Sequence, residues 1–145
     1  MTDVFTTVLS GVFVYIVGQW VLRWVIEPVQ DTRKTIGEIA HFLREYQAPI
    51  ANRDVTSKER LSEISNRLNL LSADLFSHLY LVPGYNFTRR LFGLPSSKHI
   101  RDVERELRGL SNAVVNANSR LDEEIARRHD KIFDGLGIQF PDSER

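Results

Sequence analysis

The residues best able to do chemistry in this 145-residue chain are a group of cations in its second half. The 27 residues from 75 to 101 contain no acidic side chain, although the whole chain has 19 Lys and Arg against 19 Asp and Glu. An excess of positive charge attracts anions, so we expect a binding site for an anionic group in this interval. Its cations are Arg89, Arg90, Lys98 and Arg101, and His99 lies among them.

Aromatic residues and a predicted helix start lie among these cations. Tyr85 and Phe87 could stack on a nucleobase or enter a lipid interface. Ser96 and Ser97 precede the next predicted helix, and free backbone N–H groups beside a Ser97 hydroxyl are typical of a phosphate-binding site. We therefore expect a lipid headgroup or a nucleotide such as a cyclic oligonucleotide. The structural alternative is that the aromatic residues close a helical hairpin and the cations are solvated.

The composition argues against several other classes of protein. The chain has no cysteine and four scattered histidines, so neither a disulfide framework nor a metal site is expected. The formal net charge of zero argues against general binding of double-stranded DNA. Since no nucleophile elbow, phosphate loop or dinucleotide motif is present, we expect neither an enzyme nor a cofactor.

An apolar segment near the N-terminus predicts the element that fixes the position of this site. Residues 4–22 carry no formal charge and would rise roughly 29 Å as a helix, which matches a bilayer core. Arg23, Arg33 and Lys34 follow this segment, and no cation precedes it. Because positively charged flanks stay in the cytoplasm, we expect an inner-membrane protein with its N-terminus outside and its C-terminal part cytoplasmic.

The predicted span also carries residues suited to the bilayer surface and to self-association. Trp20 and Trp24 lie one turn apart, as in the aromatic belt at lipid headgroups. Gly11 and Gly18 share one side of the helix, where small residues allow a second helix to approach. Gln19 beside them would pair with its copy, so we expect a homo-oligomer. In the alternative interpretation, Gln19 is close enough to the surface to reach water.

Beyond the span, the spacing of apolar residues predicts an all-α protein. It predicts three helices, at about residues 31–48, 56–82 and 96–134. The second and third carry apolar residues three and four apart, which is typical of an antiparallel hairpin. The expected fold is an N-terminal transmembrane helix followed by a cytoplasmic three-helix domain built on a long antiparallel hairpin.

Local signals divide the chain into three segments. We expect a transmembrane anchor at 1–28, ended by Pro28, a cytoplasmic helical domain at 29–137 and a flexible tail at 138–145. Thr56 and Glu59 predict a capping box at the start of the second helix. The two long helices also carry a second, uncharged face, which predicts a subunit seam, a wall facing a ligand or a solvated surface. Its residues are Ser62, Asn66, Asn69, Ala73, Gly109, Asn112 and Asn116.

Short strings around the predicted hairpin carry a resemblance: residues 81–83 (Leu-Val-Pro), Tyr85, residues 94–98 (Leu-Pro-Ser-Ser-Lys) and residues 110–112 (Leu-Ser-Asn). In them, the second half of the chain resembles uncharacterised small bacterial single-pass membrane proteins with a cytoplasmic helical hairpin. That resemblance implies the topology. The layout is also similar to membrane effectors of bacterial defence, whose cytoplasmic domains bind cyclic oligonucleotides and disturb the membrane.

These patterns together predict a membrane-anchored, self-associating helical protein. Its cytoplasmic domain is expected to bind an anionic ligand and to transmit that binding to the membrane span. The alternative is a passive anchor or scaffold that docks a protein partner along its asparagine-rich face.

Overall fold

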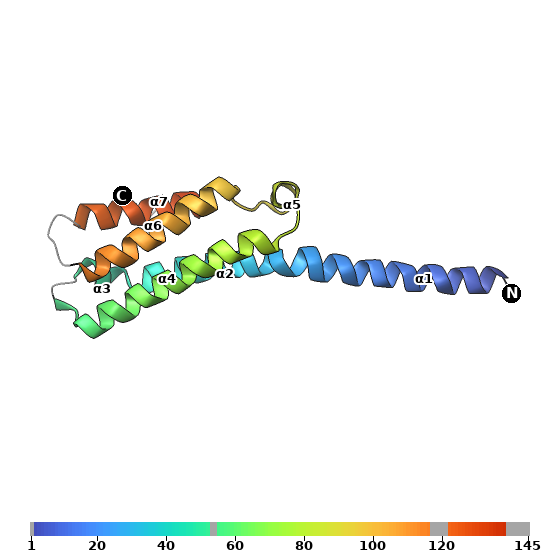
Figure 1. Ribbon diagram of the computed structural model, residues 1–145, viewed down its shortest axis with the longest axis horizontal. Coiled ribbons are helices and arrows are strands. Elements are labelled where there is room, and N and C mark those ends of the chain that lie inside the picture. Colours follow the sequence, from blue (N-terminus) through green and yellow to red (C-terminus); the bar gives the residue numbers. More distant parts are fainter. Residues whose placement is uncertain (1, 53–54, 117–121, 139–145) are drawn as a thin grey trace, which may run out of the picture.

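The computed structural model describes residues 2–52, 55–116 and 122–138, which form helices and short turns with no β-strand among them (Figure 1). The predicted all-α fold is therefore confirmed. The elements are α1 (Thr2–Val21), the π-helical turn η1 (Leu22–Ile26), α2 (Glu27–Glu45), α3 (Gln47–Ala51), α4 (Lys58–Leu81), α5 (Tyr85–Phe92), α6 (Ser97–Val115) and α7 (Asp122–Leu136).

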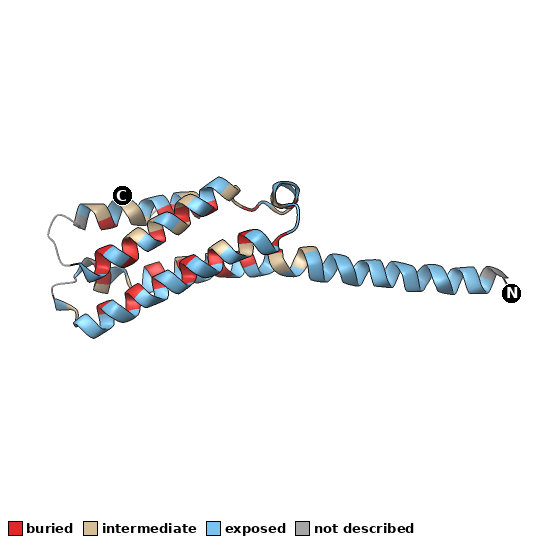
Figure 2. Cartoon of the chain, viewed as in Figure 1, coloured by how far each residue is buried: buried red, intermediate tan, exposed pale blue. Residues whose placement is uncertain are grey.

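A long N-terminal helix extends away from the rest of the molecule. α1, η1 and α2 follow one another without a break, and the stretch Val4–Glu45 counts as one helix of 42 residues. Its apolar part is long enough to cross a membrane, and none of that part is buried against the protein. Figure 2 shows α1 exposed from residue 4 onward, whereas buried residues begin in α2. The predicted apolar helix near the N-terminus is thus present.

The expected interruption of this helix at Pro28 is wrong, because a π-helical turn accommodates the proline. Pro28 lies in the first turn of α2 and has no N–H group to donate. Just before it, the backbone N–H of Glu27 bonds to the carbonyl oxygen of Leu22, five residues earlier. The wider turn absorbs one extra residue, so the apolar helix continues into the body.

We call α2 to α7 the helical body. Its long helices α2, α4, α6 and α7 pack against their neighbours in chain order and run in alternating directions (Figure 1). They share one hydrophobic core, to which the short helix α3 adds Ile50. The most deeply buried side chains of this core are Ile39, Leu43, Ile64, Leu68, Leu71, Leu75, Ile100, Val103, Leu107, Leu110, Val114 and Ile132.

The body therefore differs from the three-helix arrangement that the sequence predicts. The predicted hairpin corresponds to α4 and α6, but the predicted third helix is divided into α6 and α7, and α7 turns back along α6 (Figure 1). Asn116, Asn118 and Ser119 are weak helix formers at the point of division. Residues 117–121 lie outside the described part of the chain. The predicted tail lies there too, except Ile138, which packs against the core.

The helix ends follow local hydrogen bonding. Of the two serines before the third predicted helix, Ser96 caps α6, since its side chain accepts a hydrogen bond from the backbone N–H of His99 at 3.1 Å. The cap of α4 is Ser57, which accepts from the N–H of Arg60, and not the predicted Thr56. The Thr56 hydroxyl instead donates to the carbonyl of Asn52 at 2.9 Å, so it belongs to the preceding turn.

Candidate functional site

The segment between the two hairpin helices contains a helix of its own, α5. It is bounded by Gly84 and Gly93, whose φ angles are 57° and 65°, a conformation that glycine adopts without a steric penalty. The N–H groups of Phe87 and Thr88 both bond to the carbonyl of Gly84, at 2.8 and 3.1 Å. This geometry folds the chain sharply, so α5 lies at the end of the body from which α1 emerges (Figure 1).

The inner face of α5 is held on a small core separate from the main one. The Thr88 hydroxyl is buried and donates to the carbonyl of Pro83 at 2.8 Å. Arg33 of α2 donates to the carbonyl of Phe92, which ties α5 to the long helix. The small core consists of Val29, Val82 and Leu94, with Tyr85 and Phe92 packed against it.

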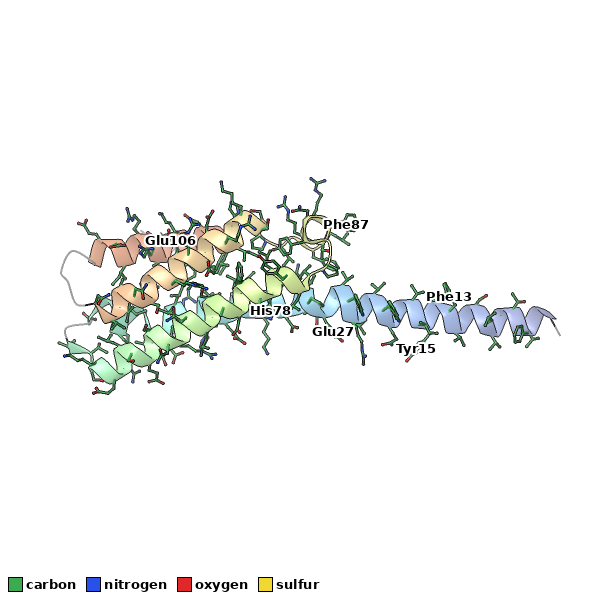
Figure 3. The ribbon with its side chains drawn as sticks, viewed as in Figure 1. Phe13, Tyr15, Glu27, His78, Phe87 and Glu106 are labelled. Carbon is green, nitrogen blue, oxygen red and sulfur yellow. The ribbon has the colours of Figure 1, made fainter. Side chains whose placement is uncertain are left out.

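The outer face of α5 is exposed and combines apolar side chains with a cation. Phe87 and Leu91 are 76% and 67% exposed, and Arg90 lies on the same face. The last turn of α4 adds two further exposed apolar side chains, Tyr80 and Leu81. We call these five residues the α5 face. Figure 3 shows Phe87 at this end of the body, the end that also carries Glu27 at the junction with α1.

Exposed apolar side chains are otherwise scattered over the helical body. Among its described residues, the other large ones are Val55 before α4, Leu70 in the middle of α4 and Val115 at the end of α6. Isolated apolar residues on a surface need no special explanation, whereas a group of them marks an interaction site. The α5 face is therefore the candidate site for contact with another surface.

A groove beside the α5 face brings four of the predicted site residues together. Tyr85, Phe87, Ser97 and Arg101 line a space of about 450 Å³ between the end of α4, α5 and the start of α6. The first turn of α6 contains no acidic residue, so no neighbouring carboxylate on this turn neutralises the positive end of the helix. The groove thus presents aromatic rings, a hydroxyl and a guanidinium to one volume.

The other predicted cations do not line this groove. Arg90, Lys98 and His99 are exposed around it, and Arg90 and Lys98 add positive charge to the surface. Arg89 is only partly exposed, and its Nε atom is buried without a hydrogen-bond partner among the described residues. The structure therefore places Arg101 in the groove, Arg90, Lys98 and His99 around it, and Arg89 on the inner side of α5.

Tyr85 has a structural role in the groove, as a hydrogen-bond donor. Its hydroxyl donates to the carbonyl of Pro95 at 2.7 Å, which ties α5 to the segment leading into α6. Burial raises the pKa of Tyr85 to about 12, and the opposing effect of the nearby Arg89 charge is smaller. The phenol consequently stays neutral at physiological pH and acts as a hydrogen-bond donor.

The predicted contact residues of α1 and η1 are exposed on the surface of the long helix. A Cβ added at Gly11 or Gly18 would meet no atom within 4 Å, and Gln19 is exposed. Trp20 and Trp24 stack with their ring centroids 5.7 Å apart. These side chains are therefore free to contact a surface that lies outside the single chain.

Sequence reasoning missed three contributors to the site. Tyr80 and Leu81 come after the buried apolar residues of α4 but do not lie on the buried side of that helix. Two apolar residues outside the apolar stripe were the sequence signal that could have identified them. The link from Arg33 to Phe92 had no sequence signal, because 59 residues separate the partners. One predicted seam residue is also reassigned: Gly109 does not belong to an open face, because Arg128 of α7 covers it.

No group of three or more side chains suited to a metal ion occurs among the residues that the structure describes. His78, one of the histidines four residues from a carboxylate, places its Nδ1 atom 3.1 Å from the hydroxyl of Thr35. No protein-family model matches this chain, and no curated protein or solved structure matches it. Its function therefore has to follow from the charge and geometry described above.

Proposed function

We propose that this chain is a single-pass inner-membrane protein whose cytoplasmic helical body docks the α5 face on the bilayer and binds anionic lipid headgroups. The observation that carries this proposal is the position of the exposed apolar side chains on the helical body. The grouped exposed apolar side chains of the body lie at the end from which the apolar helix α1 emerges. A helix that crosses the bilayer would hold this end of the body against the headgroups.

The energies are sufficient for a tethered body. Full burial of one large apolar side chain is worth roughly 1.5–3 kcal/mol, and Phe87 and Leu91 would each gain part of this at the interface. Each cation near an anionic surface adds about 1 kcal/mol, and Arg90, Lys98 and Arg101 are all exposed at this end. The tether raises the effective concentration of the bilayer, so a few such contacts are enough.

Binding at this site would be transmitted to the membrane span through α2. The small core under α5 includes Val29, and Arg33 donates to the carbonyl of Phe92. Val29 and Arg33 belong to α2, which is continuous with α1 through the π-helical turn. A headgroup that binds one arrangement of α5 more tightly than another would therefore shift the span as well.

Self-association of the span is part of the proposal. The open space at Gly11 and Gly18 would let a second copy approach closely, and the exposed amide of Gln19 would find its partner there. Copies side by side in the bilayer would present several α5 faces to one patch of lipid.

A second candidate ligand is a nucleotide messenger, which the groove of about 450 Å³ favours. That volume lies within the range of small-molecule sites. Phe87 would offer a ring for base stacking, while Arg101 and Ser97 would contact phosphate. In this version the bilayer only anchors the protein.

The absence of native cysteine allows a direct test of docking. The full chain carrying F87C and an environment-sensitive fluorophore is placed in nanodiscs of phosphatidylcholine, with or without phosphatidylglycerol. We expect a blue shift of the emission that grows with the anionic lipid and decreases in R90E. L70C is the matched control, because Leu70 is 56% exposed and lies away from the α5 face. Equal shifts at both positions would contradict docking.

The nucleotide candidate makes a different prediction for the same samples. A cyclic dinucleotide should raise the thermal unfolding midpoint of the full chain, and R101E should abolish this effect while R90E leaves it in place. If the midpoint does not move but the F87C emission responds to phosphatidylglycerol, lipid is the ligand. If neither readout responds, the chain is the passive anchor or scaffold of the alternative prediction.

A further inference from the structure

A second groove lies on the helix that leads out of α1, next to the α5 face. It measures about 490 Å³ and is formed by the junction of η1 and α2 on one side and the last turn of α4 on the other. Unlike the groove at α5, its polar lining contains both signs of charge. Arg23 contributes a guanidinium, and Glu27 and Asp31 contribute carboxylates.

The order of these charges along the helix is the informative feature. Arg23, Glu27 and Asp31 are spaced four residues apart and are all exposed, so a ligand would meet them in sequence. One helical turn rises about 5.4 Å. Arg23 is the nearest of the three to the apolar helix, and the two carboxylates lie farther from it. A zwitterion with its phosphate toward α1 and its ammonium farther out matches this order.

The remaining lining is apolar and lies where acyl chains would begin. Trp24 and Leu81 are 61% and 60% exposed, and both line this groove together with Tyr80. The carboxylates of Glu27 and Asp31 in the same lining can accept hydrogen bonds. The groove thus combines hydrogen-bond acceptors with an apolar wall.

We propose that this groove binds the headgroup of an aminophospholipid, phosphatidylethanolamine, with its phosphate on Arg23 and its ammonium on Glu27 and Asp31. The two-carbon link between phosphate and ammonium spans about one helical turn, roughly 5 Å. This inference rests on the proposed membrane span. The groove shares Tyr80 and Leu81 with the α5 face, but its charged residues and the headgroup that they bind are different.

The charges select this lipid over its neighbours in a bilayer. Phosphatidylglycerol has no cation for the two carboxylates and would bring its negative charge close to them. Phosphatidylcholine has a cation, but its methylated nitrogen has no N–H to donate. A primary ammonium donates charge-assisted hydrogen bonds to carboxylates, and one such bond changes an equilibrium by about tenfold.

The test is native mass spectrometry of the full chain released from nanodiscs that contain equal amounts of the three lipids. We expect the first retained lipid to be phosphatidylethanolamine, with about tenfold enrichment over phosphatidylcholine. The E27Q/D31N double variant should bring that ratio close to one. The matched control is E63Q/D74N, which removes the same charge from exposed positions of α4 outside the groove and should leave the enrichment unchanged.

Three results would overturn the assignment. Equal retention of phosphatidylcholine would show that donated hydrogen bonds play no role, and enrichment that survives E27Q/D31N would place the lipid elsewhere. Displacement of the lipid by free phosphoethanolamine at millimolar concentration would identify a soluble ligand instead. The F87C emission provides the separation from the proposed docking, because E27Q/D31N should not alter its response to phosphatidylglycerol.

Discussion

Two helical glycines with opposite surroundings give a prediction at the scale of single residues. A Cβ added at Gly135 would lie 2.4 Å from a methyl carbon of Val103, which is buried in the core. A Cβ added at Gly37 of α2 would meet no atom within 4 Å. We expect Gly135→Ala to lower the free energy of unfolding by about 1–3 kcal/mol, because the helices must separate. Gly37→Ala should raise it by about 0.5–1 kcal/mol, because alanine favours the helix.

Urea unfolding of the full chain in detergent, followed by circular dichroism, measures both glycine effects. A loss of stability in Gly37→Ala, or none in Gly135→Ala, would show that the packing of α7 on α6 differs from the one described.

His129 of α7 predicts a pH dependence of stability. Its ring packs against Phe133 with centroids 4.7 Å apart, and its Nε2 atom is buried without a hydrogen-bond partner among the described residues. Burial lowers the pKa of His129, although the neighbouring Asp130 charge acts in the opposite direction. In the unfolded chain the pKa returns to about 6.5, so the unfolded state binds the proton more readily. The free energy of unfolding should therefore fall as the pH decreases from 8 to 5.5.

Unfolding midpoints of the wild-type chain and His129→Leu at pH 8, 6.5 and 5.5 check this. The variant should lose part of the decrease between pH 8 and 5.5. If the unfolding midpoint of His129→Leu falls with pH as steeply as that of the wild-type chain, another group causes the pH dependence.

Sequence signals at single residues were sufficient where the interaction is local. The pair Ser96 and Ser97 marks the start of α6 in the sequence, because a capping hydroxyl only needs to reach an N–H three residues later. At the start of α4, Thr56 and Ser57 both have the required hydroxyl, and the choice depends on the preceding turn, where Thr56 bonds to Asn52. Gly109 was assigned to an open face because nothing near it in sequence reveals that Arg128 lies over it.

At the scale of helices, one arginine of α7 forms an ion pair with α6. Arg128 donates to Glu106 of α6 and to Glu124 of its own helix, both at 2.6 Å, and its side chain is 23% exposed. The hydrogen bond to Glu124, together with the nearby charge of Glu106, raises the pKa of Arg128 above its ordinary value, so the guanidinium stays charged. Arg128→Gln should cost about 1–3 kcal/mol of local stability, since two partly buried carboxylates lose their main partner.

Hydrogen exchange of the α7 amides is the appropriate readout, because local opening of this helix precedes global unfolding. Arg105→Gln is the matched control. Arg105 is 79% exposed and 3.9 Å from Asp102, and such surface pairs contribute little. Equal exchange in both variants would show that the Arg128 ion pairs do not hold α7 in place.

The elements that the sequence failed to predict are those that depend on a turn. The apolar stripe of the third predicted helix continues in phase through residues 117–121, so periodicity alone could not separate α6 from α7. α5 is only eight residues long, which is too short for an apolar helical period to be recognised in the sequence. Pro28 is a helix breaker by its local chemistry, but the π-helical turn before it removes the conflict, and that turn has no established sequence signal.

For the whole molecule, the sequence indicates which region holds the candidate site, but not how the residues of that region are arranged in space. The excess of cations from 75 to 101 is visible in the composition, and it marks the end of the body that α1 leaves. Which of these residues share a groove depends on how α4, α5 and α6 meet. Tyr85, Phe87, Ser97 and Arg101 come together there, whereas Arg89, although it follows Phe87 by only two residues, turns to the inner side of α5.

The orientation of the chain in the membrane is the last prediction, and the cysteine-free sequence makes it directly measurable. Single variants V4C and N116C place a thiol at each end of the molecule, at exposed positions. A membrane-impermeant maleimide should label V4C in intact spheroplasts and N116C only after lysis, because Arg23, Arg33 and Lys34 follow the apolar helix. The control adds cations to the opposite flank with T2K/D3K, which should produce labelling of N116C in part of the intact population. Full labelling of N116C before lysis would place the body outside. There the α5 face would no longer meet the anionic cytoplasmic leaflet, and the proposed docking would lose its electrostatic contribution.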